Sequence, residues 1–229
     1  MDNVFIESLA EHSTTIVPPP ETARHLAALR LRDGERVGVL NGKGLLASCT
    51  VERKERTDMI LHVVSRSVET AAIPFVLCMG LLDNRDRMEF VVEKATELGV
   101  TDLMFIDADH HQHHGSVKME RMEAKAKAAL TQCGRLWLPV LHEPATLQDV
   151  IGRMPSDAVA YAGDQFGGAI TTEPTHSSGC WIYVGPEGGF SRGEQDLLDA
   201  SNIRRIRIGR YRLRAETAAI ALMSVISAR

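Results

Sequence analysis

The sequence predicts an α/β protein with a parallel sheet, preceded by a smaller domain built of short strands. From residue 74 onward, apolar stretches of strand length alternate with helical periodicities, which is typical of a parallel sheet with crossover helices. Before residue 70 the apolar stretches are short, and Asn41-Gly42 indicates a hairpin turn. We therefore expect a small β-barrel at residues 1–70 and an α/β domain at residues 74–229.

Composition and charge exclude several classes of protein. Hydrophobic residues make up 44% of the 229 residues, which supports a packed core and argues against disorder. No apolar run is long enough to span a membrane, and the first residues lack the parts of a signal peptide. The scattered cysteines form no CxxC pair and are expected to be reduced, mostly buried thiols: Cys49, Cys78, Cys133 and Cys180. We predict a cytoplasmic protein with no membrane partner.

The first domain is expected to consist of strands around one short helix. Strands are predicted at residues 4–6, 36–40, 45–51 and 59–64. A rigid loop, Pro18-Pro19-Pro20, precedes a short helix that carries Ala23, Leu26 and Arg30. The polar segment Ser65–Ile73 is expected to be the domain boundary.

The second domain is expected to alternate strands and helices. Strands are predicted at residues 75–79, 101–106, 138–141, 158–163 and 180–184. Helices are predicted at residues 85–98, 119–134, 147–153 and 215–229, and Gly99 stands where a helix commonly ends. Residues 164–178 show no period and are expected to form a polar loop.

One strand-loop-helix unit is expected to dominate this domain. The buried strand Cys180–Val184 leads into Gly185-Pro186-Glu187-Gly188-Gly189, and Ser191 with Glu194 has the form of a capping box that starts a helix. Open α/β sheets bind ligands at such loops, where backbone N–H groups are exposed. Spacing alone leaves an ordinary strand-to-helix turn equally open.

A second unit of this kind lies some twenty residues later and is rich in arginine. The strand-loop segment holds a run of basic residues: Arg204, Arg205, Arg207, Arg210, Arg212 and Arg214. With a net charge of −4 the chain lacks the overall charge of a nucleic-acid binder, so an RNA site requires such a local cluster. The alternative is that several of these arginines are solvated or paired with acidic residues.

The segment from Asp107 to Gly115 holds four histidines within five residues: His110, His111, His113 and His114. A first-row metal site needs a folded geometry that adjacent loop histidines seldom provide. We therefore expect a solvated loop and no metal, with contact between these histidines and phosphate as a further alternative.

The two loops, GPEGGFS at residues 185–191 and LRAETA at residues 213–218, together resemble the RsmE family. These are SPOUT-class methyltransferases that modify a uridine of 16S ribosomal RNA. The resemblance extends over Asp86–Val100, over Glu120-Arg121 and Thr131–Arg135, and partly over His25–Arg30. The chain departs from the family pattern at a set of positions that includes Asp2, Asn3, Asn84, Met122 and Ala128.

The resemblance implies a fold, an activity and partners. It implies a PUA-like barrel followed by a SPOUT domain whose chain forms a deep trefoil knot around S-adenosylmethionine. It implies methylation of N3 of a uridine in 16S ribosomal RNA within the small ribosomal subunit. It also implies a homodimer that involves the last helix, whose apolar stripe is otherwise expected to pack mostly in the core: Ala219, Leu222, Met223 and Ile226.

The resemblance also places the site residues. The predicted cofactor-binding residues are Gly163, Val184, Gly185, Pro186, Glu187, Gly188, Gly189, Ile208, Gly209, Tyr211, Leu213 and Ala218. The glycines would let the backbone approach adenosine, and Ile208 and Leu213 would offer it apolar surface. Glu187 either bonds a ribose hydroxyl or caps its loop.

The predicted catalytic residues are Arg214, Arg212 and Glu216, with Arg214 favoured as the group that stabilises a developing uridine anion. Glu216 is either a base or, more in keeping with its place in a first helical turn, a group that stabilises the helix start. The predicted RNA-binding residues are Arg30, Arg85, Arg87, Arg121, Gln132, Arg135 and Arg210.

Two other functions stay open from the sequence. The chain is alternatively a SPOUT methyltransferase for another RNA, or a non-catalytic RNA-binding relative. The cofactor loops favour an enzyme, whereas the departures at Asn84, Met122 and Ala128 keep the alternatives open.

Overall fold

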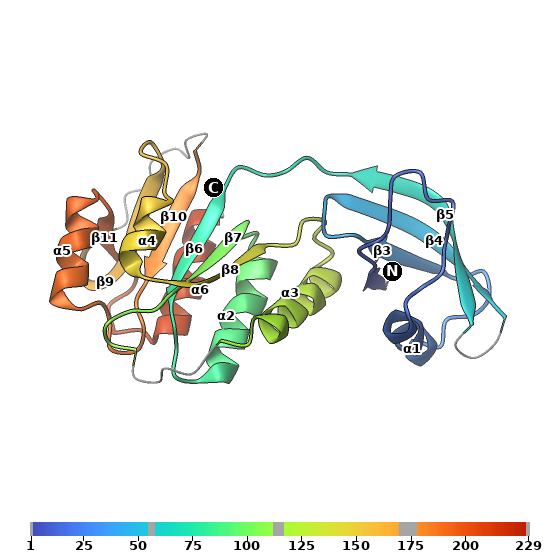
Figure 1. The fold of residues 1–229 in the computed structure, drawn as a ribbon, viewed down its shortest axis with the longest axis horizontal. Coiled ribbons are helices and arrows are strands. Elements are labelled where there is room, and N and C mark those ends of the chain that lie inside the picture. Colours follow the sequence, from blue (N-terminus) through green and yellow to red (C-terminus); the bar gives the residue numbers. More distant parts are fainter. Residues whose placement is uncertain (1, 55–57, 112–116, 170–177, 228–229) are drawn as a thin grey trace. The chain divides into compact units, whose positions relative to one another are not determined.

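The computed structural model describes residues 2–54, 58–111, 117–169 and 178–227, and the chain forms two compact units (Figure 1). The first unit comprises residues 1–71 with 127–138, and the second comprises residues 72–126 with 139–229. Residues 127–138 differ from the division made on the sequence. They group with the first unit because Leu130 and Leu136 share an apolar cluster with Leu40.

The first unit is a five-stranded sheet in the order β1-β3-β4-β5-β2. Only β1 and β3 run parallel, and the other pairs are antiparallel. One apolar core draws on every strand and on α1, with Val4, Val39 and Leu61 among its members. The elements are β1 (Asn3–Phe5), β2 (Thr15–Ile16), α1 (Pro20–Ala28), β3 (Arg36–Leu40), β4 (Leu45–Arg53) and β5 (Met59–Val68).

The hairpin expected at Asn41-Gly42 is confirmed. The Asn41 side chain accepts hydrogen bonds from the backbone N–H groups of Lys43 and Leu45, and Gly42 has a positive φ of 71°. The boundary expected at Ser65–Ile73 contains the division between the units, which falls between Ala71 and Ala72. Its first residues still belong to β5, which continues to Val68 and pairs with the start of β4. Backbone pairing holds this part of the strand although its side chains are exposed.

The second unit contains a six-stranded sheet in the order β11-β9-β10-β6-β7-β8, and every pair is parallel. The predicted α/β class is therefore confirmed, while the knot stays a prediction. The strands are β6 (Phe75–Gly80), β7 (Asp102–Ile106), β8 (Val140–Ala145), β9 (Val159–Ala169), β10 (Cys180–Val184) and β11 (Arg204–Arg207).

Helices cover both faces of this sheet (Figure 1). Leu147 and Leu198, from α4 and α5, join the apolar cluster that contains Val76 and Cys78 of β6. Residues that alternate with these point to the other face, where α6 packs against α2, β6, β9 and β10. The helices are α2 (Arg85–Glu97), α3 (Met119–Cys133), α4 (Leu147–Gly152), α5 (Arg192–Ala200) and α6 (Ala215–Ser227).

Two predicted strand boundaries are wrong. Strand β8 begins at Val140 rather than Leu138, because Leu138 packs in the apolar cluster of the first unit. Strand β9 continues to Ala169, where a polar loop was expected, because Gly168 and Ala169 pair with β11 beyond a register shift. Residues 170–177 of that expected loop lie outside the described residues.

Other predictions of burial agree with the structure. Cys49, Cys78 and Cys180 are buried, Cys133 is exposed, and none forms a disulfide among the described residues. Within the described ranges, no helix combines the length and apolarity needed to cross a bilayer.

Candidate cofactor and substrate site

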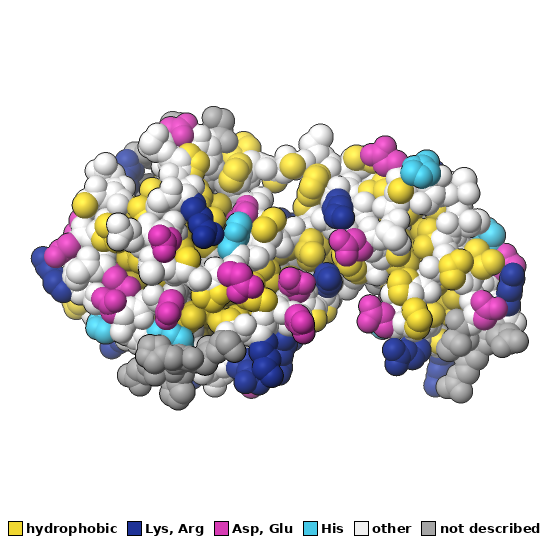
Figure 2. Space-filling view, in the orientation of Figure 1, with side chains coloured by type: hydrophobic (Ala, Val, Ile, Leu, Met, Phe, Trp, Pro, Cys, Tyr) yellow, Lys and Arg dark blue, Asp and Glu magenta, His cyan; other side chains and the backbone are white. Residues whose placement is uncertain are grey.

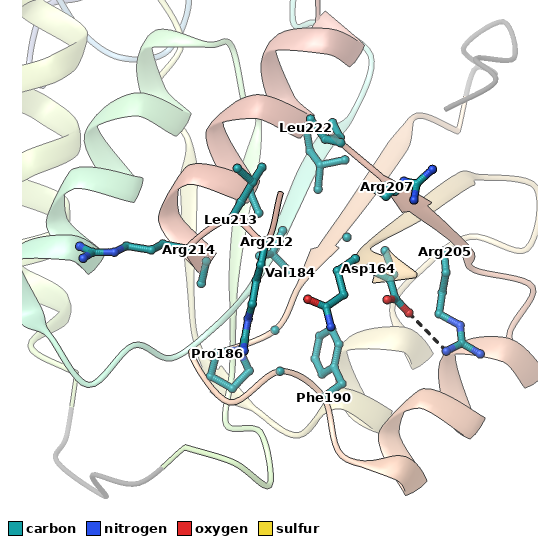
Figure 3. A pocket seen from close by; sticks show the side chains of 18 of the residues that line it. Asp164, Val184, Pro186, Phe190, Arg205, Arg207, Arg212, Leu213, Arg214 and Leu222 are labelled. Carbon is teal, nitrogen blue, oxygen red and sulfur yellow. Dashed lines mark hydrogen bonds and ion pairs between the residues drawn. The ribbon is translucent and has the colours of Figure 1, made fainter. Parts of the chain in front are cut away.

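A cavity of about 660 Å³ lies in the second unit, at the loops that follow β10 and β11 and along the second half of β9 (Figure 3). Parallel sheets place ligands at the carboxyl ends of their strands. The cavity is lined by Arg87, by Ala162–Phe166, by Val184–Phe190, by Gln195 and Leu198, by Arg205–Ile208, by Tyr211–Ala215, and by Ala218 and Leu222.

The first loop, Gly185–Ser191, is tightly built. Its N–H at Gly189 bonds the carbonyl of Pro186 at 2.9 Å, and a Cβ at Gly185 would lie 3.0 Å from the nitrogen of Phe190. The predicted capping box is confirmed, since the Ser191 side chain accepts from Glu194 N while Glu194 accepts from Ser191 N. A side chain at position 185 would therefore force the loop to give by a few tenths of an ångström.

A segment far away in the sequence holds this loop in place. Ser191 Oγ donates to Asp109 Oδ2 at 2.5 Å, and Asp109 N donates to Glu194 Oε1 at 3.0 Å. His110 Nδ1 lies 3.2 and 3.0 Å from the carbonyl oxygens of Gly188 and Gly189, so it donates to them in the tautomer protonated at Nδ1. Asp109 and His110 are exposed, as expected of a solvated loop, although both make these contacts. The expectation is wrong for His111, which is buried.

The histidine-rich segment shows no metal centre where it is described. No group of three or more His, Cys, Asp or Glu side chains in the described ranges has the arrangement of a metal site. His111 is buried and faces Asp107, with His111 Nδ1 3.1 Å from the carboxylate. His113 and His114 lie outside the described residues.

The second loop, Ile208–Arg214, is much more open. Tyr211 is 77% exposed, and the Arg210 guanidinium lies 5.8 Å from the centre of its ring. Arg212 Nη2 reaches Glu187 O at 3.5 Å, which connects this loop with the first. Leu213 and Val184 both line the cavity. In Figure 3 the Arg214 side chain extends away from the other labelled side chains.

Arg205 lies on the side of Figure 3 opposite to Arg214 and is bound by acidic and amide side chains. Its Nε donates to Asp199, and its Nη1 lies 3.4 Å from Asp164 Oδ2 and 3.2 Å from Gln195 Oε1. The hydrogen bond to Asp199 raises the pKa of Arg205. For this arginine, pairing with acidic residues is the interpretation that the structure supports.

Arg87 lines the cavity from the first turn of α2. Its Nη1 lies 3.8 Å from Glu187 Oε1 of the first loop, and its Nε lies 3.6 Å from Glu216 Oε1 of α6. Glu216 is only 8% exposed and is not part of the cavity lining. A carboxylate-guanidinium-carboxylate bridge therefore joins α2, the first loop and α6.

The structure brings together most of the predicted cofactor and catalytic residues. Every predicted cofactor-binding residue except Gly209 lines the cavity, as do Arg212 and Arg214. Sequence reasoning missed Asp164, Phe166, Gln195 and Leu222 as lining residues. The sequence could have indicated Asp164 as a lining residue, because it directly follows an apolar strand segment. No local signal marks Gln195.

The predicted RNA-binding residues are distributed over both units. Arg30, Gln132 and Arg135 belong to the first unit, and Arg85, Arg87, Arg121 and Arg210 belong to the second. Arg121 pairs with Glu89, and burial lowers the pKa of Arg135. On the face shown in Figure 2, basic and acidic side chains are interspersed.

A family model described as an RNA methyltransferase domain matches residues 69–227, and one described as an RNA methyltransferase PUA domain matches residues 18–63. The chain belongs to this family of RNA methyltransferases. Its PUA domain is the N-terminal β domain expected from the sequence.

Relatives named ribosomal RNA small subunit methyltransferase E match nearly the whole chain. That of Aquifex aeolicus is 26% identical, covering 89% of this chain and 90% of its own length. That of Bacillus subtilis is 25% identical, with coverages of 99% and 96%. These relatives confirm the resemblance to the RsmE family.

Solved structures share the fold. A ribosomal RNA small subunit methyltransferase E from Neisseria gonorrhoeae, bound to S-adenosyl methionine, has a TM-score of 0.89 at 21% identity and covers 98% of this chain and 96% of its own. A methyltransferase from Legionella pneumophila, also with this cofactor, has a TM-score of 0.85 at 24% identity, with coverages of 99% and 96%.

Proposed function

We propose that this protein is an S-adenosylmethionine-dependent methyltransferase that acts on N3 of a uridine in 16S ribosomal RNA of the small ribosomal subunit. The observation that supports it most is the cavity itself, which gathers residues of both signature loops within an RNA methyltransferase domain. The names of the full-length relatives support the class of RNA. A cytoplasmic location, where ribosomes are, belongs to the same proposal.

The residues around the cavity fit the cofactor. Its volume of about 660 Å³ is in the range of small-molecule sites. Val184, Ile208 and Leu213 offer apolar surface to an adenine ring, and the carboxylates of Asp164 and Glu187 suit hydroxyl groups or positive charge. When bound, S-adenosylmethionine supplies an electrophilic methyl group, and the electron pair of the broken carbon–sulfur bond stays on sulfur.

The chain's own contribution is alignment, exclusion of water and electrostatics. The tightly held first loop fixes one wall of the cavity, and alignment of two reactants contributes about 7–11 kcal/mol in favourable cases. The target uridine must be unpaired to reach such a cavity. Arg212 and Arg214, predicted from the sequence to be catalytic, line the cavity and stay proposed for that role. The buried Glu216, the third residue of that prediction, is better suited to support Arg87 than to contact a substrate.

Mass mapping of small-subunit ribosomal RNA, from cells with and without the gene, tests the proposal. We expect one uridine to lose a methyl group in the deletion strain and to regain it when purified protein and S-adenosylmethionine are added to the isolated subunits. If the methyl group is instead lost from a different RNA, the proposed substrate is wrong but the proposed reaction stands. Identical maps would contradict the proposal.

A homodimer is part of the proposal, although its expected basis changes. Ala219, Leu222 and Met223 of the expected stripe are buried within one chain and form core, whereas Ile226 is half-buried and stays a candidate for the interface. Phe166 is 86% exposed beside the cavity and is a better candidate for a contact between copies. Light scattering at micromolar concentration should give twice the mass of one chain, and Phe166→Asp should lower it.

A further inference from the structure

Arg87 lines the cavity that both signature loops border. It projects from the first turn of α2 into the cavity, between Glu187 of the first loop and Glu216 of α6. Its side chain is 35% exposed, so it is half-buried yet open to a ligand. The sequence indicated only an RNA contact for this residue.

The hydrogen bonding of this cluster is incomplete. Among the described residues, the Arg87 guanidinium forms ion pairs at 3.6 and 3.8 Å but no hydrogen bond within ordinary limits. Glu216 Oε2 is buried and has no hydrogen-bond partner among the described residues. An unsatisfied buried carboxylate oxygen is costly. Catalytic hydrogen bonds are often long without ligand and shorten when substrate binds.

The other arginines along the cavity are arranged differently. Arg205 is hydrogen-bonded to Asp199 and Gln195 and so has fewer N–H groups to offer. Arg212 and Arg214 are exposed, and Arg214 extends away from the pocket side chains in Figure 3. Arg207, the fifth arginine that lines the cavity, is exposed as well. Of the five, Arg87 alone is partly buried and has guanidinium N–H groups that form no hydrogen bond among the described residues.

We propose that Arg87 is the catalytic residue that hydrogen-bonds the carbonyl oxygen of the target uracil on which negative charge develops, and that Glu216 is the positioning residue that orients it. The inference rests on the proposed uridine methylation. The N3 proton leaves to water, its electron pair spreads onto the adjacent carbonyl oxygens, and N3 then forms the bond to the methyl group. A fixed guanidinium stabilises that anion, as donors of an oxyanion hole do.

The surrounding charges are compatible with this role. Glu187 and Glu216 flank the guanidinium, Asp83 N donates to Glu187 Oε2, and Arg212 contacts the Glu187 carbonyl. The two carboxylates attract the guanidinium of Arg87 from α6 and from the first loop, and they keep it at the cavity where a base can accept a hydrogen bond from it.

The kinetic test compares Arg87→Gln, Arg87→Lys and Arg192→Gln on purified small subunits. Arg87→Gln should lower kcat by about a hundredfold or more, whereas Arg87→Lys, which keeps the charge, should lose less. The loss should shrink as pH rises, because the uridine then ionises unaided. Arg192 is an exposed helix residue paired with Asp196, and its variant should match wild type. Calorimetry with S-adenosylhomocysteine should give the same affinity for all four proteins.

A measurement without turnover tests the same point. RNA with 5-fluorouridine at the target position is bound with S-adenosylhomocysteine, and fluorine NMR follows ionisation of the base with pH. In the wild-type complex the base should ionise at lower pH than in free RNA, and in Arg87→Gln its midpoint should return toward that of free RNA. Equal midpoints in the two complexes would overturn the inference.

Glu216 is tested by its own pair of variants. Glu216→Gln keeps the shape of the side chain and should raise the midpoint pH of base ionisation part of the way toward that of free RNA. Glu216→Ala should raise this midpoint further. Thermal melting checks that both variants fold. A wild-type protein that methylates no ribosomal RNA would overturn the proposed function. A wild type that methylates, beside an Arg87→Gln protein with the same pH profile, would overturn only the role of Arg87.

Discussion

The two loops around the cavity differ in how they are held. The first, Gly185–Ser191, is fixed by its own turn, by the capping box and by Asp109 and His110. The second, Ile208–Arg214, is exposed over Gly209–Arg212 and contacts the first through one long hydrogen bond from Arg212. The first loop is preorganised for a small ligand, and the second is open to a large one. Rigid walls reduce the entropy lost when a ligand binds.

The largest expected effect comes from displacing the rigid loop through its neighbour Gly80. A methyl group there would lie 2.5 Å from the Pro186 nitrogen and 2.8 Å from the carbonyl carbon of Gly185, so the loop must shift. Gly80→Ala should weaken S-adenosylhomocysteine binding because the loop is displaced, and overpacking of this kind also costs about 1–3 kcal/mol of stability. Calorimetry measures the binding. Gly152→Ala, with open space around the new methyl group, is the control.

A smaller effect is expected from Glu194, which connects the loop with Asp109. Glu194→Ala removes the acceptor of two N–H groups, those of Ser191 and Asp109, and should cost about 1–2 kcal/mol of stability. Urea unfolding measures the loss. Asp196→Ala, on the exposed face of the same helix, should change stability by well under about 1 kcal/mol. Equal losses in both variants would contradict the distinction between the loops.

The smallest effect is expected in the open loop. Arg210→Ala should leave unfolding and S-adenosylhomocysteine affinity unchanged, because Arg210 is exposed and its guanidinium lies over the ring of the exposed Tyr211. It should weaken RNA binding and lower the salt slope by about one phosphate contact. Filter binding at two salt concentrations measures both. Arg153→Ala, another exposed arginine of this unit, should bind RNA as wild type does. A cofactor-binding defect in Arg210→Ala would show that the open loop also holds the small ligand.

Local signals explain what the sequence could predict. The capping box at Ser191 and Glu194 spans three residues, and the strand Cys180–Val184 is a continuous apolar run, so both were visible without a fold. The hydrogen bond from Ser191 to Asp109 joins residues 82 positions apart and forms because two neighbouring loops meet at one edge of the sheet. No periodicity indicates such a contact.

The same reasoning explains the errors. Gly168 and Ala169 look like loop residues, and only pairing with β11 makes them strand. Arg214 lines the cavity as its motif suggests, and its catalytic role stays a prediction. Arg87 reaches the same cavity from α2, which packs against α6. The motifs mark loops that line the cavity, whereas the partial burial of Arg87 between Glu187 and Glu216 depends on tertiary packing.

The contact between His110 and Gly188 has a consequence for how this family varies. A Cβ at position 188 would lie 2.8 Å from His110 Cβ, while the imidazole of His110 holds the carbonyls of Gly188 and Gly189. The two positions are therefore not independent during evolution. Homologues with a side chain at the position of Gly188 should carry a smaller residue at the position of His110, so the pair should covary although 77 residues separate them.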